Sequence, residues 1–321
     1  MEKLKQAVRN YALRHRNHDG LALTPVPGLK LKCVEAPQGR HYAVLRPLVV
    51  FVLQGAKRMT IGLENRTITV GHSAIVSVDM PVVTHIERAS PEQPYLAVAV
   101  ELEMAMLAEA ATYLAPARTE GRAPPLFADD AEAAALDCVM RLVGLCDRPA
   151  AIALLRPGIM LELHYWLLRG PHGADLGVLC DPASQANRLA AAIAILRTEF
   201  RTRISVERLA AEAGMGLSTF HTHFRRLLSL SPGQYQKRLR LIEARRLMLE
   251  EGVSASSAAY EVGYESVSQF TREYARLFNA PPKRDAQRAR SASGGLGTRA
   301  GDGRMPGPAV EAGTTQAAPP R

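Results

Sequence analysis

The sequence has few aromatic residues and few cysteines. Aromatic residues make up 5% of its 321 positions, and the four cysteines (Cys33, Cys138, Cys146 and Cys180) lack any C-x-x-C spacing. This argues against a structural zinc site or a disulfide framework. No apolar run reaches the ~18 residues of a membrane span, and the N-terminus lacks the apolar segment of a secretory signal. We therefore expect a soluble cytoplasmic protein without membrane contact.

The charge of the chain is unevenly distributed. Residues 1–182 carry 19 basic and 19 acidic side chains, whereas residues 183–290 carry 18 basic and 10 acidic ones, out of a net charge of +9. A solvated helical surface explains most single arginines. A basic excess confined to one segment is instead the electrostatic signature of nucleic-acid binding.

The stretch Val262–Phe278 has the pattern of the second half of a helix-turn-helix motif. Gly263 ends one helix, Ser266 caps the next, and aromatic residues then recur every four positions (Phe270, Tyr274 and Phe278). That spacing places the three rings on one buried face. The opposite face carries small polar groups, an amide and two guanidiniums, which match the base edges and phosphates of DNA.

A related pattern occurs about fifty residues earlier, where Gly214 precedes Phe220 and Phe224. Between the two motifs, 234–250 contains no glycine or proline, which predicts a helix of about 25 Å. Such a rod could hold two recognition helices in adjacent major grooves. We expect Arg238, Arg240 and Arg245 on this rod to remain solvated. The prominent side chains Met215, Trp166, Phe220, Phe224, Phe270 and Tyr274 are interpreted as core.

These motifs together resemble the AraC/XylS family of bacterial transcription regulators. The resemblance covers Gln185 to Asp285. The matching signature residues are Gly263, Tyr264, Ser266, Ser268, Phe270, Arg272 and the closing Pro281-Pro282. The first motif departs from the family at Thr222, where a basic residue is common, and at Gly216, where a capping serine is common. Its base contacts are therefore less well defined.

The periodicity of each recognition helix assigns the DNA contacts. The predicted base-contacting residues are Ser218, His221, Thr222, Val267, Ser268, Gln269, Thr271 and Arg272. The predicted phosphate contacts are Arg225, Arg226, Ser266 and Arg276. Gln269 suits adenine, and Arg272 suits either bidentate bonding to guanine or a phosphate.

The N-terminal half is predicted to be β structure. Short strands are expected over 42–54, 74–78, 82–87 and 96–102, with a hairpin over 59–70 that turns at Glu64-Asn65. This spacing predicts a small barrel or double-sheet roll, similar to the cupin-like sensory domain of the family. The predicted fold class is thus α+β in two domains: a cupin-like barrel with a helical segment, then an all-α domain with two helix-turn-helix motifs.

A barrel interior could hold one small molecule. The candidate effector-pocket residues are Tyr42, Arg46, Asp79 and His85. Enzymatic cupins bind metal through a His-x-His pair that this half of the chain lacks, so we expect no metal, no other cofactor and no enzyme activity. Cys33 is either a buried thiol or a sensor of electrophiles.

Helical periodicity beyond the barrel, over 129–146 and 157–169, predicts two helices that either form a dimerisation hairpin or cover the barrel. The expected segments are an N-terminal helical arm (1–20), a β sensory domain (21–115), a helical packing segment (116–172), a linker (173–184), the DNA-binding domain (185–287) and a disordered tail (288–321).

The resemblance implies a sequence-specific regulator of transcription, in family habit an activator. It also implies double-stranded DNA, RNA polymerase, a small-molecule effector and a second copy of the chain as partners. The alternative is a metal- or ligand-binding cupin enzyme or carrier with an accessory DNA-binding domain.

Overall fold

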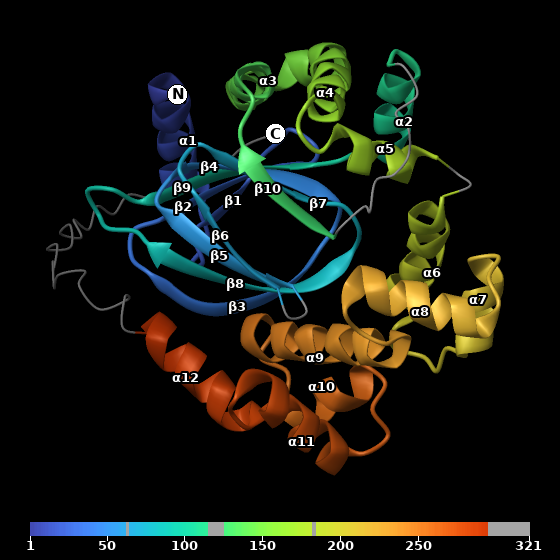
Figure 1. The fold of residues 1–321 in the computed structure, drawn as a ribbon. Coiled ribbons are helices and arrows are strands. Elements are labelled where there is room, and N and C mark those ends of the chain that lie inside the picture. The colour runs from blue at the N-terminus through green and yellow to red at the C-terminus, as the bar shows by residue number, and fades with distance from the viewer. Residues whose placement is uncertain (62–63, 115–124, 182–183, 295–321) are drawn as a thin grey trace, which may run out of the picture.

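The computed structural model describes residues 1–61, 64–114, 125–181 and 184–294. An N-terminal part combines strands with helices, and the C-terminal part is entirely helical (Figure 1). The predicted two-part α+β architecture is confirmed. The helical part lies against one sheet of the N-terminal part, while further helices cover the opposite sheet (Figure 1).

In the described part of the chain, ten strands form two antiparallel sheets that enclose a common interior. The six-stranded sheet has the order β1-β2-β9-β4-β7-β10, and the four-stranded sheet has the order β3-β8-β5-β6. The strands are β1 Leu21–Leu23, β2 Leu29–Val34, β3 Gln38–Leu45, β4 Leu48–Gln54, β5 Ala56–Ile61, β6 Glu64–Thr69, β7 His72–Val76, β8 Met80–Arg88, β9 Tyr95–Glu101 and β10 Leu126–Asp130.

Several predicted strands differ in detail from those observed. The single strand expected over 42–54 is two strands in different sheets, because the chain leaves β3 at Arg46-Pro47 before entering β4. The predicted hairpin is present, but Ile61 pairs with Glu64, so its turn precedes Glu64-Asn65. β1, β2 and β10 were not predicted. β1 and β10 are three and five residues long, which weakens their periodic signal. β2 does alternate apolar and charged residues with the period of two of a strand, and this signal was missed.

Helices cover the outer face of the six-stranded sheet. They are α1 Glu2–His15, α2 Met104–Thr112, α3 Ala133–Gly144 and α4 Ile152–Arg169. By length and composition alone, the helix over 149–169 could cross a membrane, although the sequence predicts no membrane span. A helix packed in a protein core meets the same test, and α4 packs against α2, α3 and α5 (Gly173–Cys180). α5 occupies the start of the segment predicted as a linker over 173–184, so that start is helical.

The C-terminal part is a tandem of two helix-turn-helix motifs. Its helices are α6 Gln185–Glu199, α7 Val206–Glu212, α8 Leu217–Leu228, α9 Pro232–Glu250, α10 Ala255–Glu261, α11 Val267–Phe278 and α12 Pro282–Gly294. The predicted tail begins inside α12, and 295–321 lies outside the described residues. Recognition helices α8 and α11 both end at a residue with positive φ, Ser229 and Asn279. The turn between α10 and α11 is one residue longer than the turn between α7 and α8.

The two motifs belong to different hydrophobic clusters. Phe220 and Phe224 of the first motif join the large core that continues into the barrel. Phe270 and Tyr274 of the second motif form a separate cluster with the C-terminal half of α9 and with α10. The second motif thus packs largely on itself and on one helix.

Candidate nucleic-acid interface

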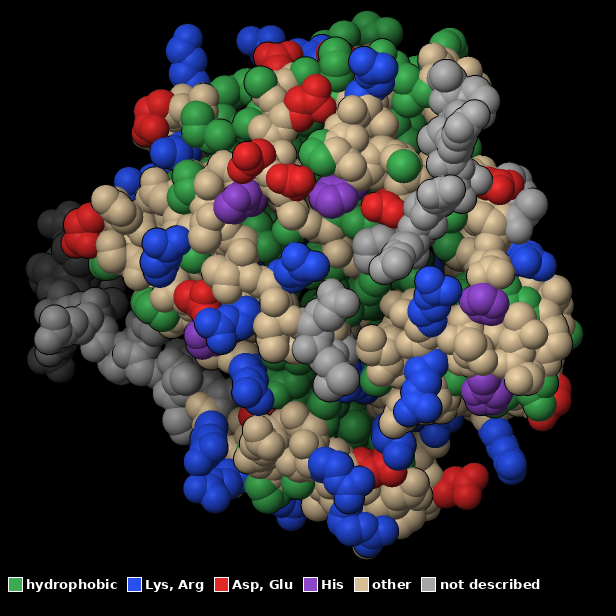
Figure 2. Space-filling model, viewed as in Figure 1, with side chains coloured by type: hydrophobic (Ala, Val, Ile, Leu, Met, Phe, Trp, Pro, Cys, Tyr) green, Lys and Arg blue, Asp and Glu red, His purple; other side chains and the backbone are tan. Residues whose placement is uncertain are grey.

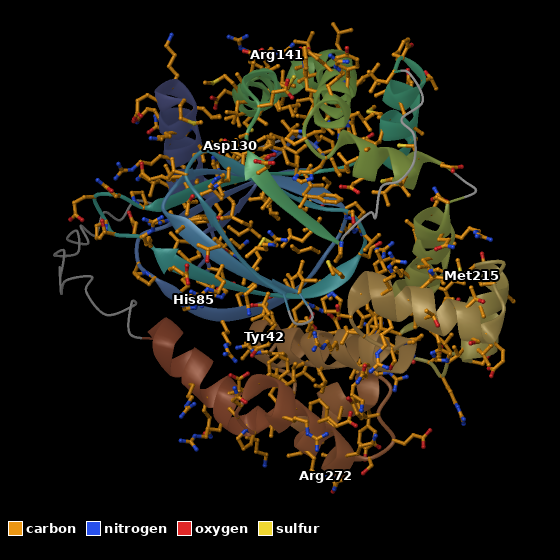
Figure 3. All side chains as sticks on the ribbon, viewed as in Figure 1. Tyr42, His85, Asp130, Arg141, Met215 and Arg272 are labelled. Carbon is orange, nitrogen blue, oxygen red and sulfur yellow. The ribbon has the colours of Figure 1, made fainter. Side chains whose placement is uncertain are left out.

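Both recognition helices present a solvated polar face opposite their buried rings. On α8, Ser218, His221 and Thr222 are exposed. On α11, Ser268, Gln269 and Arg272 are exposed, while Val267 and Thr271 are half-buried. Arg272 lies at the outer side of α11, away from the barrel (Figure 3). The structure therefore leaves the predicted base-reading faces open to solvent.

Four exposed arginines flank these faces. Arg225, Arg226, Arg272 and Arg276 are exposed, and no described residue forms an ion pair or hydrogen bond with them. Lys and Arg side chains gather over the helical part of the surface, where acidic side chains are fewer (Figure 2). Unpaired guanidiniums on a basic surface are available for phosphates and base edges.

Some polar groups on the helices already have a local bond. The Thr222 hydroxyl donates to the Ser218 carbonyl (3.0 Å), and the Thr271 hydroxyl donates to the Val267 carbonyl (2.8 Å). Each threonine oxygen can still accept a bond, and each methyl can contact thymine. The Gln269 amide donates to Glu273 at 3.4 Å, and its second N–H has no partner among the described residues.

The two helix N-termini differ in capping. Ser266 accepts a hydrogen bond from the Gln269 N–H of α11 at 3.3 Å. Gly216 stands at the equivalent position of α8 and provides no side-chain cap. The first-turn N–H groups of α8 therefore lack a side-chain cap and are available to a phosphate.

Arginines on α9 hold the two motifs together. Arg240 donates to the carbonyl oxygens of Phe200 (2.6 Å), Thr202 (2.8 Å) and Gly263 (2.8 Å). Arg245 pairs with Asp285 of α12 at 2.8 Å. The expectation that both arginines stay solvated is wrong. A helical pattern shows which face carries a charge, but not which backbone carbonyls the tertiary fold brings to it.

Comparisons with known proteins agree with this geometry. The family model described as "AraC-type transcriptional regulator N-terminus" matches residues 25–175, and the "Helix-turn-helix domain" model matches residues 209–288. The chain belongs to the AraC family of transcriptional regulators.

Two relatives of this AraC-family chain are named as HTH-type transcriptional activator RhaS. The protein from Salmonella arizonae is 30% identical over 162 residues, covering 49% of this chain and 56% of the relative. The protein from Escherichia coli strain SE11 is 30% identical over 100 residues, covering 31% of this chain and 36% of the relative. The alignments thus span about half, or about a third, of these relatives.

The solved structure of ToxT from Vibrio cholerae strain SCE256, bound to an unsaturated fatty acid, shares the fold. Its TM-score is 0.54 at 10% identity, and the match covers 80% of this chain and 94% of ToxT. A second ToxT structure, in a P21 crystal form, has a TM-score of 0.56 at 9% identity and covers 81% of this chain and 98% of ToxT. At these identities the comparison shows the fold alone.

In this AraC-family chain, the four-stranded sheet contacts the second motif through Tyr42. The Tyr42 hydroxyl donates to the Leu277 carbonyl at 3.2 Å, and its ring packs edge-on against Phe278 with 4.6 Å between centroids. The Arg245 guanidinium lies over both rings. Tyr42 lies between the barrel and α9 (Figure 3). The contact is at the C-terminal end of α11 and leaves its polar face free.

A second contact joins the end of the same sheet to α9 and α6. The Tyr235 hydroxyl donates to the Asp79 carbonyl at 2.8 Å. The Asp79 carboxylate lies 3.4 Å from Arg197. Burial raises the pKa of the Asp79 carboxyl, although nearby Arg197 and Arg46 oppose that shift. The sensory part therefore holds the DNA-binding part at two separate places.

The four predicted pocket residues do not come together inside the barrel. Tyr42 pairs in register with Val83, two residues from His85, on the outer face of the four-stranded sheet. Asp79 lies at the junction with α9 and α6, and Arg46 is exposed near it. The sequence did not distinguish the inner from the outer face of the four-stranded sheet, because both faces are covered in the folded protein.

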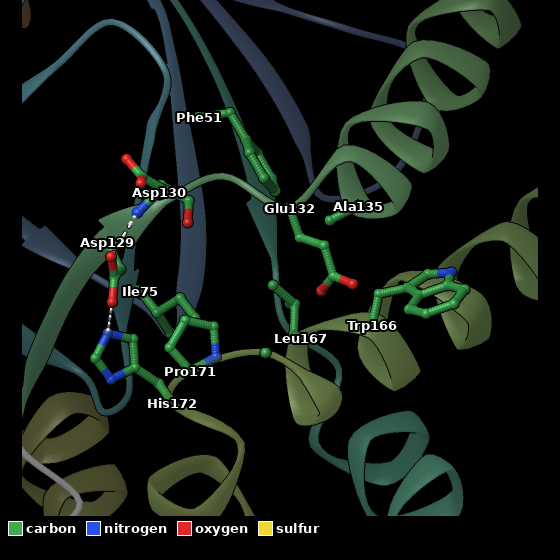
Figure 4. Close-up of a pocket in the computed structure, with 12 residues that line it drawn as sticks. Phe51, Ile75, Asp129, Asp130, Glu132, Ala135, Trp166, Leu167, Pro171 and His172 are labelled. Atoms are coloured by element: carbon green, nitrogen blue, oxygen red, sulfur yellow. Dashed lines mark hydrogen bonds and ion pairs between the residues drawn. The ribbon is translucent and has the colours of Figure 1, made fainter.

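A small cavity between the six-stranded sheet and α4 does not suit an effector either. It is lined by Asp129, Glu132, Trp166 and His172 among others, with His172 3.8 Å from Asp129 (Figure 4). Its volume is about 20 Å³, which is room for about one water molecule.

Cys33 is fully buried on the helix-covered face of β2. Burial raises the pKa of its thiol, although Arg16 opposes this shift. The reactive thiolate is therefore disfavoured, and the buried alternative describes Cys33 better.

Proposed function

We propose that this protein is a sequence-specific DNA-binding transcription regulator whose two helix-turn-helix motifs read successive major-groove segments. The observation that carries the proposal is the pair of solvated polar faces on α8 and α11, held by α9. At 19 residues α9 is about 28 Å long, close to the ~34 Å repeat of the major groove along one side of DNA.

The contacts divide into two kinds. Ser218, His221 and Thr222, together with the polar face of α11, contact bases. Arg225, Arg226, Ser266 and Arg276 contact phosphates and set the register of each helix. The start of α8 has no side-chain cap, so its N–H groups can bind a DNA phosphate. Contacts to the DNA backbone therefore form a larger share of the contacts of the first motif than of those of the second.

The N-terminal part is the sensory domain in this proposal, and the junction between α5 and α6 separates it from the DNA-binding domain. The RhaS relatives are named as activators, which supports activation as the role of this regulator. The fatty acid bound to ToxT supports a small-molecule effector. The proposed location is the cytoplasm. RNA polymerase and a second copy of the chain are its further proposed partners.

Selection of bound duplexes from random DNA at about 150 mM salt tests this function, because specific contacts survive such salt better than nonspecific ones. We expect enrichment of a bipartite site with halves about one helical turn apart. Enrichment of one half only would assign base reading to the second motif alone. Salt-sensitive binding without enrichment would contradict the proposal.

Arg272→Ala should weaken binding to the selected site by about 1–3 kcal/mol and relax preference at one base position. The matched control is Arg276→Ala, one turn further along α11. It should weaken specific and random DNA alike and reduce the salt slope by about one. Repeating the selection with both variants checks this. Equal losses on specific and random DNA for Arg272→Ala would assign it to a phosphate.

A further inference from the structure

The two recognition helices present different chemistry to DNA. α11 carries the amide of Gln269 and the guanidinium of Arg272 within its first two turns. α8 contains no lysine or arginine before Arg225. Amides and guanidiniums are the side chains that bond bidentately to adenine and guanine. The first motif therefore needs other groups to read sequence.

An apolar side chain occupies the start of α8. Leu217 is the first residue of the helix and is 44% exposed, whereas most leucines of the C-terminal part are buried. The Cα–Cβ bonds of a helix tilt toward its N-terminus, so this side chain extends past the helix start. The N-terminal residues of a recognition helix are the ones that contact base edges. Leu217 thus lies where a base is read.

Thr222 adds a second apolar group to this surface. It is exposed and lies on the side of α8 opposite to the buried rings of Phe220 and Phe224. Its hydroxyl donates to the Ser218 carbonyl at 3.0 Å, which fixes the side-chain rotamer. The methyl group is therefore held in one orientation on an exposed face.

The major groove offers such groups one kind of partner. Thymine alone among the four bases has a methyl group on its major-groove edge. The other major-groove edges present hydrogen-bond donors and acceptors, and an apolar side chain that covers one of these leaves it without a partner. Contact with the thymine methyl instead removes apolar surface of both groups from water.

We infer that the first motif selects a half-site that contains thymine, and that Leu217 and Thr222 read it through the thymine methyl groups. The inference rests on the proposed function, because it names the bases that the first motif recognises. Threonine stands at position 222, where a basic residue is common in the family. Here it reads a methyl group rather than a hydrogen-bonding edge.

The test uses the duplex recovered by selection with the full-length protein, with single thymidines replaced by deoxyuridine. Uracil pairs with adenine as thymine does and lacks only the methyl group. Replacing a contacted thymine in the first half-site should weaken binding about fourfold, which is the effect of one buried carbon group. Replacing a thymine between the half-sites is the DNA control and should leave the affinity unchanged.

Two variants identify the side chains. Thr222→Ser removes the methyl group and keeps the hydroxyl that bonds to Ser218, and Leu217→Ser removes the apolar side chain. Each should weaken binding to the thymine duplex about fourfold or more. Uracil at the thymine that the lost group contacted should then cause no further loss, because the two changes remove the same interaction.

Leu154→Ser is the matched control for the protein. Leu154 is 81% exposed on α4, which packs on the six-stranded sheet, away from the DNA-binding part. This variant should leave the affinity for DNA unchanged.

Three outcomes would overturn the inference: a recovered first half-site without thymine, an unchanged affinity when each of its thymines is replaced by uracil, or the same loss on uracil in both variants as in the parent protein. Recovery of the second half-site alone would overturn it as well. In each of these cases the selected site still supports a sequence-specific regulator. Only binding without any enrichment contradicts the proposed function, so the two failures are distinguishable.

Discussion

Gly263→Ala should disrupt the second helix-turn-helix motif. Gly263 has φ +88, which costs a residue with a Cβ about 1–2 kcal/mol. An added Cβ would also lie 1.9 Å from the backbone carbonyl oxygen of Arg201, which cannot move without disturbing the end of α6. We expect a total loss above about 3 kcal/mol, beyond the usual range of single substitutions.

Gly214→Ala is the matched control in the first motif. Gly214 has φ +59, but an added Cβ meets nothing within 4 Å, so only the conformational cost of about 1–2 kcal/mol applies. Thermal unfolding of both full-length variants, with DNA binding of each half-site, measures the difference. Similar losses in the two variants would show that backbone conformation alone governs these turns.

Phe270→Ala should unfold the second motif while the rest of the protein stays folded. Phe270 is 0% exposed, with ring centroids 5.3 Å from Tyr264 and 5.4 Å from Tyr274. Removing such a ring costs about 3–5 kcal/mol. Because the cluster around Phe270 is separate from the main core, we expect this loss to remain local.

Hydrogen exchange of the full-length protein measures this prediction directly. Protection should fall in α10 and α11 and persist in the barrel and α8, and binding to the half-site of the second motif should disappear. Phe270→Leu keeps most of the buried volume, so it should retain binding. Unchanged protection in Phe270→Ala would contradict the assigned helix register, and loss of protection throughout would mean that the two clusters unfold together.

The sequence alone determined the recognition helices because their signals are local. The four-residue spacing of Phe270, Tyr274 and Phe278 shows the buried face without knowledge of the neighbours. Ser266 and Gly263 mark helix ends by chemistry that acts within a few residues. The family resemblance rested on the same positions, and it anticipated the uncapped start of α8 at Gly216.

The tertiary structure alone decided which face of each barrel strand is interior. Strand side chains alternate with a period of two, so neighbouring residues point to opposite sides. His41 faces the interior and Tyr42 faces the DNA-binding part. Of these two neighbours, Tyr42 was predicted to line a pocket and His41 was not. Both faces of this sheet are covered, one by the other sheet and one by α9, so alternation could not distinguish them. Arg240 was likewise assigned to solvent, because its carbonyl partners at residues 200–202 and 263 are distant in sequence and meet only in the folded chain.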